Sequence, residues 1–116
     1  MKRILIVDDE FSVRESLKLI LQDQYKILMV DNAKEALVLF ERENPHLVLL
    51  DIILPEMDGI TVLKRIREMD ATVPVIMLTA TRMVKTAVEA MKMGATDYLS
   101  KPFEIEELKL IIEKAI

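Results

Sequence analysis

Short aliphatic runs alternate along this chain with longer segments in which apolar residues recur every three or four positions. The aliphatic runs predict strands that are buried on both faces, and the periodic segments predict amphipathic helices. A helix is expected after each strand, which gives consecutive strand-helix units. The strands are expected at Arg3 to Asp8, Lys26 to Val30, residue 47 to Asp51, Val75 to Thr79 and Asp97 to Ser100.

Capping residues predict where the helices begin and end. Ser12 and Glu15 have the spacing of a capping box in the first helix, and Asn32 is a preferred N-cap for the second. Gly94 ends the fourth helix. The helices after the first are expected from Asn32 to about Glu43, from Gly59 to about Met69, over about Met83 to Met93, and over Ile105 to about Ala115.

Each helix has an apolar face that is expected to pack against the sheet. In the fourth and fifth helices the inward residues are expected to be Val84, Ala87, Val88 and Met91, and then Ile105, Leu108, Ile111 and Ile112. The predicted fold is therefore α/β, a doubly wound parallel sheet with helices on both faces. Because crossovers are right-handed, the winding reverses once, and the flavodoxin-like (βα)5 strand order 2-1-3-4-5 places strands one and three at that reversal. Residues 1–116 are expected to form this one domain.

A lone acid, Asp51, interrupts the aliphatic run of the third strand. A carboxylate in such surroundings is rare unless it is paired or binds a metal. An edge-strand acid or a helix N-cap is the alternative, but the segment Pro55 to Gly59 supplies its own turn and helix start. Ligands of doubly wound sheets bind at the carboxyl ends of the strands. Asp51 therefore predicts a functional site there.

Other polar residues lie at the carboxyl ends of the first, fourth and fifth strands, at the same edge of the sheet. Asp8 and Asp9 end the first strand, Thr79 ends the fourth and Lys101 follows the fifth. Three carboxylates about 5 Å apart repel one another by about 3 kcal/mol per pair at an effective dielectric constant of about 20. A cation is needed between them, and oxygen ligands favour Mg²⁺. Zinc is disfavoured because the chain has no cysteine and its one histidine, His46, lies at the far end of the third strand.

Hydrogen-bond donors are expected opposite this metal. The Lys101 ammonium, the Thr79 hydroxyl and the backbone N–H of Ala80 could surround an oxyanion. A metal and a lysine together neutralise a transferring phosphoryl group, and an aspartate can be the nucleophile that accepts it. These strand ends therefore point to phosphoryl transfer onto Asp51.

Composition excludes several other classes of protein. The absence of cysteine rules out a disulfide framework and suits a reducing, cytoplasmic location. A net charge of -4 argues against a nucleic-acid surface. The apolar run from Ile4 to Val7 is too short for a signal peptide, and no transmembrane span is expected.

The motifs together resemble the receiver domain of two-component response regulators. They are Asp8-Asp9-Glu10, Asp51, Pro55-Glu56-Met57-Asp58-Gly59, Thr79-Ala80, Gly94-Ala95, Tyr98 and Lys101-Pro102-Phe103. The resemblance implies that a sensor histidine kinase phosphorylates Asp51. It implies that Asp9, Asp51 and the Ile53 carbonyl hold Mg²⁺, that Asp8 acts mainly through water, and that Lys101 contacts the phosphoryl group.

The resemblance also implies a conformational switch and a docking surface. Thr79 is expected to move toward the phosphoryl group, Tyr98 to swing inward behind it, and the Lys101-Pro102 bond to be cis. Kinase helices are expected to dock near Phe11, Glu15, Pro102 and Phe103. The resemblance further implies that Ile53 and Thr81 flank the phosphoryl group, at positions that tune its hydrolysis in this family. The domain is expected to be a phosphoacceptor rather than an enzyme.

Rival functions fit the sequence less well. An FMN-binding flavodoxin needs a phosphate-binding loop where Asp8-Asp9-Glu10 would repel phosphate, and a haloacid-dehalogenase-like phosphatase needs a second acid where Ile53 stands. Within signalling, the chain could be a phosphorelay intermediate, or a receiver cut from a DNA-binding transcriptional regulator. A homodimer or an output partner is expected on the face between the fourth strand and the last helix.

Overall fold

The computed structural model describes residues 1–80 and 83–116, and within them strands and helices alternate along the chain. All five predicted strand starts are confirmed. β1 ends one residue earlier than predicted, whereas β4 and β5 each end one residue later. The elements are β1 (Arg3–Val7), α1 (Phe11–Leu21), β2 (Lys26–Val30), α2 (Ala33–Glu43), β3 (Leu47–Asp51), α3 (Gly59–Met69), β4 (Val75–Ala80), α4 (Val84–Lys92), β5 (Asp97–Lys101) and α5 (Ile105–Ala115).

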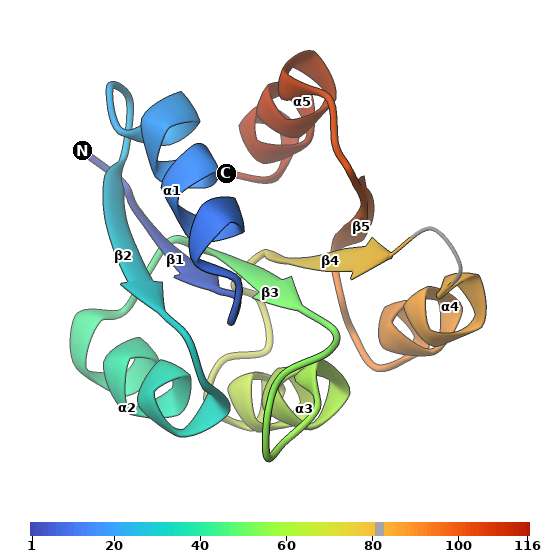
Figure 1. Cartoon of the computed structure of the whole chain (residues 1–116). Helices are drawn as coiled ribbons and strands as arrows, with labels where there is room; N and C mark the ends of the chain where they lie inside the picture. The colour runs from blue at the N-terminus through green and yellow to red at the C-terminus, as the bar shows by residue number, and fades with distance from the viewer. Residues whose placement is uncertain (81–82) are drawn as a thin grey trace.

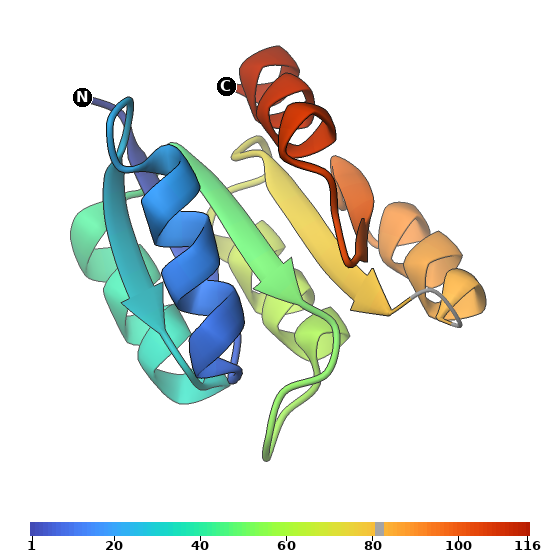
Figure 2. The ribbon, with the colours of Figure 1, turned by 45° about the horizontal axis from the view of Figure 1, so that its top comes forward.

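The strands form one parallel sheet in the order β2-β1-β3-β4-β5, which confirms the predicted flavodoxin-like topology. Helices α1 and α5 cover one face of the sheet, and α2, α3 and α4 cover the other (Figures 1 and 2). The winding reverses between β1 and β3, which lie side by side with Val7 opposite Leu50. The carboxyl ends of these two strands therefore open at the same edge.

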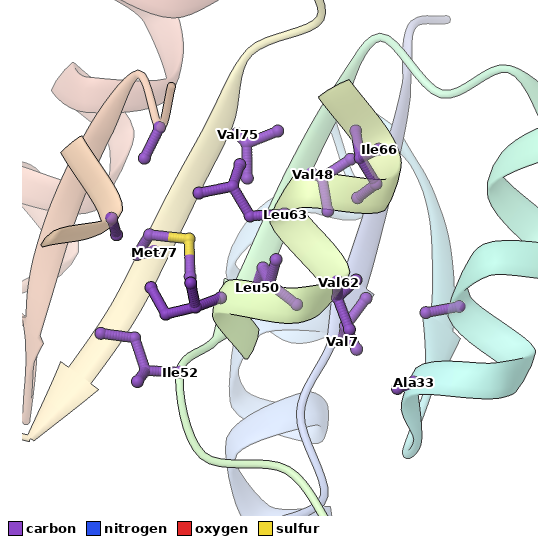
Figure 3. Close-up of a cluster of buried hydrophobic side chains, with 14 of the residues drawn as sticks. Val7, Ala33, Val48, Leu50, Ile52, Val62, Leu63, Ile66, Val75 and Met77 are labelled. Atoms are coloured by element: carbon purple, nitrogen blue, oxygen red, sulfur yellow. The ribbon is translucent and has the colours of Figure 1, made fainter. Parts of the chain in front are cut away.

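Alternate residues of the strands fill two cores, one on each face of the sheet, because side chains along a strand point in alternate directions. Val48 and Leu50 of β3 pack with Leu63 of α3 on one side (Figure 3). Leu47 and Leu49 pack toward α1 and α5 on the other side. Residues 47–51 of β3 are all buried. Asp51, the last residue of the strand, is therefore a buried carboxylate at the carboxyl edge of the sheet.

One predicted helix cap is confirmed and another is wrong. The Asn32 side chain accepts a hydrogen bond from the Glu35 amide at 2.9 Å, as expected for an N-cap. The capping box of Ser12 and Glu15 does not form, because α1 begins at Phe11, before Ser12. Only three residues connect β1 to α1, and the Asp8 carboxylate accepts the Glu10 amide instead, at 2.9 Å.

The predicted inward faces of α4 and α5 are partly wrong. Val84, Val88 and Met91 are 56%, 46% and 40% exposed, and α4 rests on the sheet through the small residues Ala87 and Ala90. Because α4 lies near the β5 edge of the sheet (Figure 1), the sheet covers only a narrow side of the helix. Ile105 is also exposed, although Leu108 and Ile112 of α5 are buried as expected and Ile111 is half-buried.

None of the helices in the described part of the chain has the length and apolar character needed to cross a membrane.

Candidate functional site

Three aspartates meet where the carboxyl ends of β1 and β3 lie together. Asp51 is the last residue of β3 and only 6% exposed, Asp8 follows β1 and is fully buried, and Asp9 is exposed. One carboxylate oxygen from each of the three lies within 4.8 Å of the others. An all-oxygen donor set at this spacing fits Mg²⁺, which takes carboxylates and keeps several waters.

The turn after β3 fixes the orientation of Asp51. The Ile53 amide donates to Asp51 Oδ1 at 3.1 Å, and the Gly59 amide donates to the Ile52 carbonyl at 2.6 Å. A Cβ atom at Gly59 would collide with the Asp51 carbonyl oxygen and lie 2.7 Å from the Ile52 Cα. The start of α3 can therefore pack this closely behind the site only because residue 59 has no side chain.

Lys101 reaches into the same cluster from the end of β5. Its Nζ donates to Asp8 Oδ2 at 2.7 Å, to Asp51 Oδ2 at 3.1 Å and to Glu10 Oε1 at 3.3 Å. Lys101 thus already supplies part of the positive charge that these carboxylates require. The expected cis Lys101–Pro102 bond is present.

The electrostatics of the cluster favour a cation or a neutral acid. Burial and the charge of Asp8 raise the pKa of Asp51 from 3.8 to about 6, although the Ile53 amide and Lys101 oppose this rise. Burial lowers the pKa of Lys101, but the hydrogen bond to Asp8 and the charges of Asp51 and Asp8 outweigh it, so the pKa lies above its ordinary value. Lys101 therefore remains an ammonium at neutral pH, while Asp51 holds its proton to a higher pH than an ordinary carboxyl group.

The predicted switch residues lie on β4 and β5, with Thr79 near the carboxyl end of β4 and Tyr98 nearer the start of β5. The Thr79 hydroxyl is buried and donates to the Ala80 carbonyl at 3.1 Å, within its own strand end. Tyr98 lies opposite Met77 in the β4–β5 register and is 39% exposed. The Ile53 side chain, two residues after Asp51, is 53% exposed. Thr81 lies outside the described residues.

His46 is placed as predicted, at the amino ends of the strands. Its Nδ1 accepts a hydrogen bond from the Arg3 amide at 2.9 Å, and its own amide donates to the Arg3 carbonyl at 2.8 Å. Burial and the charges of Arg3 and Lys2 lower the pKa of His46. His46 therefore serves as a structural link between β1 and β3, far from the acidic cluster.

The sequence assigned no role at the site to two residues, although one of them, Glu10, belongs to the Asp8-Asp9-Glu10 motif. Glu10 shares the Lys101 ammonium with the aspartates, and Arg14 Nη1 donates to the Asp8 carbonyl at 2.8 Å. The available signal was their position shortly after the Asp8-Asp9 pair, with Glu10 as the N-cap of α1 and Arg14 in the first turn of the helix. A hollow of about 480 Å³ beside Lys101 is lined by α1 and by the residues after β5, which include Pro102 and Phe103.

Comparisons with known proteins agree on one family. The sequence profile of the response regulator receiver domain matches residues 4–113. Regulatory protein AtoC of Escherichia coli (strain K12) is 46% identical over all of this chain and 25% of its own length. The probable transcriptional regulator ycf27 of Porphyra purpurea is 39% identical over 99% of this chain and 47% of its own length. The chain thus spans between a quarter and half of the length of these relatives.

Solved structures show the same likeness. NtrX from Brucella abortus superimposes with a TM-score of 0.94 at 35% identity, covering 99% of this chain and 27% of NtrX. A response regulator receiver domain protein from Clostridium thermocellum gives a TM-score of 0.95 at 30% identity, covering 100% of this chain and 94% of that protein.

Proposed function

Because this chain belongs to the response regulator receiver domain family, we propose that Asp51 is its phosphoacceptor in two-component signal transduction, with Mg²⁺ as cofactor and a sensor histidine kinase as phosphodonor. The observation that carries the proposal is the position of Asp51, a buried carboxylate within hydrogen-bond distance of Lys101 and beside two further aspartates. The domain is then a phosphoacceptor rather than an enzyme, and a cytoplasmic location follows from the proposed partner.

In the proposed reaction, a carboxylate oxygen of Asp51 attacks the phosphorus of a phosphohistidine. A P–O bond forms as the P–N bond breaks, and the imidazole leaves with the electron pair of the broken bond. Lys101, already 3.1 Å from Asp51 Oδ2, neutralises charge on the phosphoryl oxygens. Asp9, Asp51 and the Ile53 carbonyl would hold Mg²⁺, with Asp8 acting mainly through water. When bound, Mg²⁺ adds positive charge that stabilises the transferring group.

Asp8 is suited to an indirect role toward the metal. It is fully buried, and its two carboxylate oxygens already accept hydrogen bonds from the Glu10 amide and from Lys101. The exposed Asp9 carboxylate is the one with room for a new ligand. This contrast supports Asp9 as the direct ligand of the pair.

We further propose that phosphorylation shifts an equilibrium between two conformations. The Thr79 hydroxyl, now bonded to the Ala80 carbonyl, would turn to a phosphoryl oxygen, and Tyr98 would move inward behind it. A shift from 1:99 to 99:1 needs about 5.5 kcal/mol, which a few charge-assisted hydrogen bonds of about 1.5 to 3 kcal/mol each can supply. The exposed apolar residues of the α4 to α5 face would then meet an output partner or a second copy. They are Val84, Val88, Met91, Tyr98 and Ile105.

The names of the relatives favour one setting for this switch. AtoC is a regulatory protein, ycf27 is a probable transcriptional regulator, and both are longer than this chain. We propose that the domain controls an output domain of a transcriptional regulator, and that contact with DNA belongs to that output domain. A phosphorelay intermediate is the alternative outcome, and transfer of phosphate from Asp51 to a second histidine protein would identify it.

Labelling with acetyl phosphate tests the central proposal. The protein is incubated with acetyl phosphate and Mg²⁺, and its intact mass is measured. We expect one phosphoryl adduct in the wild type, and none in Asp51→Asn or in the presence of EDTA. An adduct on Asp51→Asn at the wild-type rate, or undiminished labelling in EDTA, would contradict the proposal.

A further inference from the structure

Hydrogen bonds to both the backbone and the side chain of Asp8 hold the three-residue connection between β1 and α1. The Asp8 amide donates to the Val30 carbonyl at 3.2 Å, and its carboxylate oxygens accept from the Glu10 amide and from Lys101. Its carbonyl oxygen, past the end of β1, accepts from Arg14 Nη1 at 2.8 Å. Arg14 therefore completes the fixation of Asp8 from the first turns of α1.

We propose that Arg14 is a positioning residue for the Mg²⁺ site, because its bond to the Asp8 carbonyl fixes the peptide plane from which the Asp9 carboxylate projects. The Asp8 carbonyl and the Asp9 amide belong to one planar unit, so holding the oxygen also holds the nitrogen that leads to the Asp9 Cα. Asp9 is exposed, and its direction therefore depends on the backbone rather than on packing. This inference rests on the function proposed above.

Arg14 is itself well anchored. Its amide donates to the Glu10 carbonyl at 3.1 Å within α1, and its guanidinium lies 5.7 Å from the centroid of the Phe11 ring. The bond to the Asp8 carbonyl carries the guanidinium's charge, which makes it stronger than a neutral hydrogen bond. The cation–π contact with Phe11 and the helix backbone together hold the donor where the Asp8 carbonyl requires it.

A positioning role and a purely electrostatic role predict opposite results. Arg14 is a cation beside an acidic cluster, so its charge alone repels Mg²⁺, and its removal would tighten metal binding. Loss of a residue that orients a ligand has the opposite effect and typically weakens metal binding about 10- to 100-fold. The sign of the change in the Mg²⁺ dissociation constant therefore separates the two roles.

The test is a Mg²⁺ titration of the whole chain. Calorimetry gives the dissociation constant, and the amide NMR signals of Asp9 and Glu10 report binding at the site. For Arg14→Met, which keeps the aliphatic stem but has no donor, we expect a dissociation constant raised about ten-fold. Arg14→Lys, which keeps a cationic donor, should recover part of this loss. At saturating Mg²⁺, labelling of Arg14→Met by acetyl phosphate should return to the wild-type rate.

Arg67→Met is the matched control. Arg67 also donates to backbone carbonyls, of Gly94 at 2.9 Å and of Asp70 at 3.2 Å, but it lies at the other end of α3 from the site. We expect its loss to lower thermal stability and leave Mg²⁺ affinity within about two-fold of wild type. Thermal unfolding in EDTA checks that each variant folds, and Arg14→Leu, which also has no donor, replaces Arg14→Met if that protein does not fold.

Three results would overturn the inference. An unchanged or lower dissociation constant for Arg14→Met would show that Arg14 does not orient the metal ligands. An equal loss of affinity in Arg67→Met would show a general effect of destabilisation. Failure of the wild type to bind Mg²⁺ would remove the proposed function as well, whereas the first two results leave that function standing.

Discussion

Replacing the proposed phosphoacceptor, Asp51→Asn, is expected to stabilise the metal-free protein at neutral pH. The ionised Asp51 carboxylate is buried beside the charge of Asp8, and these two causes raise its pKa from 3.8 to about 6 despite the Ile53 amide and Lys101. Asparagine has nearly the same shape and carries no charge. The variant therefore removes the unfavourable ionisation and keeps the packing.

The expected magnitude follows from this pKa. A rise of about two pKa units corresponds to about 3 kcal/mol, since each unit is 1.36 kcal/mol. Solvent at the open edge of the site reduces the gain, so we expect about 1.5 to 3 kcal/mol at pH 7. For 116 residues, unfolding entropies of about 2.1 cal/mol/K per residue convert 1 kcal/mol into about 4 °C, which gives a rise in Tm of about 6 to 12 °C.

The pH dependence has a definite sign. Because the folded pKa of Asp51 is above its unfolded value of 3.8, the stability that the wild type gains from a protonated Asp51 is complete below pH 3.8 and is lost as the pH rises through about 6. The advantage of Asp51→Asn should therefore grow between about pH 4 and pH 7 and be absent below that window. The reason is that the buried charge destabilises the wild type only when Asp51 is ionised, and asparagine carries no charge at any pH.

Thermal and urea unfolding in EDTA, at several pH values, measure this difference. Asp23→Asn, at an exposed position in the turn between α1 and β2, is the matched control and should change Tm by less than about 2 °C. Adding Mg²⁺ should stabilise the wild type and reduce the advantage of Asp51→Asn. A variant that is no more stable than the wild type at pH 7, or an advantage that does not change with pH, would refute the electrostatic reasoning.

Three further changes test other parts of the molecule. Gly59→Ala should destabilise the protein by about 2 to 3 kcal/mol in urea unfolding, because the added Cβ meets the Asp51 carbonyl, and unchanged stability would contradict that contact. Thr79→Ala should still accept phosphate, but the Tyr98 NMR signals should shift far less with beryllofluoride and Mg²⁺ than in the wild type; equal shifts would show that Thr79 does not couple the site to that face. Phe103→Ala should slow transfer from the cognate kinase without slowing acetyl phosphate labelling, and equal slowing of both would mean that the site itself was damaged.

The sequence by itself determined the order of elements, the sheet topology and the aspartate at the end of β3. The three central strands, β1, β3 and β4, are buried on both faces and are therefore aliphatic along nearly their whole length, so each of them is visible in a few consecutive residues. Right-handed crossovers then restrict how five such units can be wound. Asp51 was visible for the same reason, because a single charged residue contrasts with an otherwise apolar run.

Only the tertiary structure decided which side of α4 is buried. Helical periodicity predicted that Val84, Val88 and Met91 face the sheet, yet the helix packs through Ala87 and Ala90 and leaves the larger residues in solvent. An apolar stripe indicates that a face will be covered, but it does not say by what. The width of the covered side depends on where the sheet ends, and that is a property of the assembled fold.

The contacts inside the site also required the three-dimensional structure. Lys101 binds Asp8 across 93 residues of sequence, and Arg14 reaches the Asp8 carbonyl oxygen, a backbone atom that every residue carries and that no sequence pattern distinguishes. Local sequence encodes strands and helices because their hydrogen bonds and apolar faces repeat over short intervals. The positions of individual charges relative to one another depend instead on how the strand ends come together, and this packing brings the Lys101 ammonium to Asp8 and Asp51.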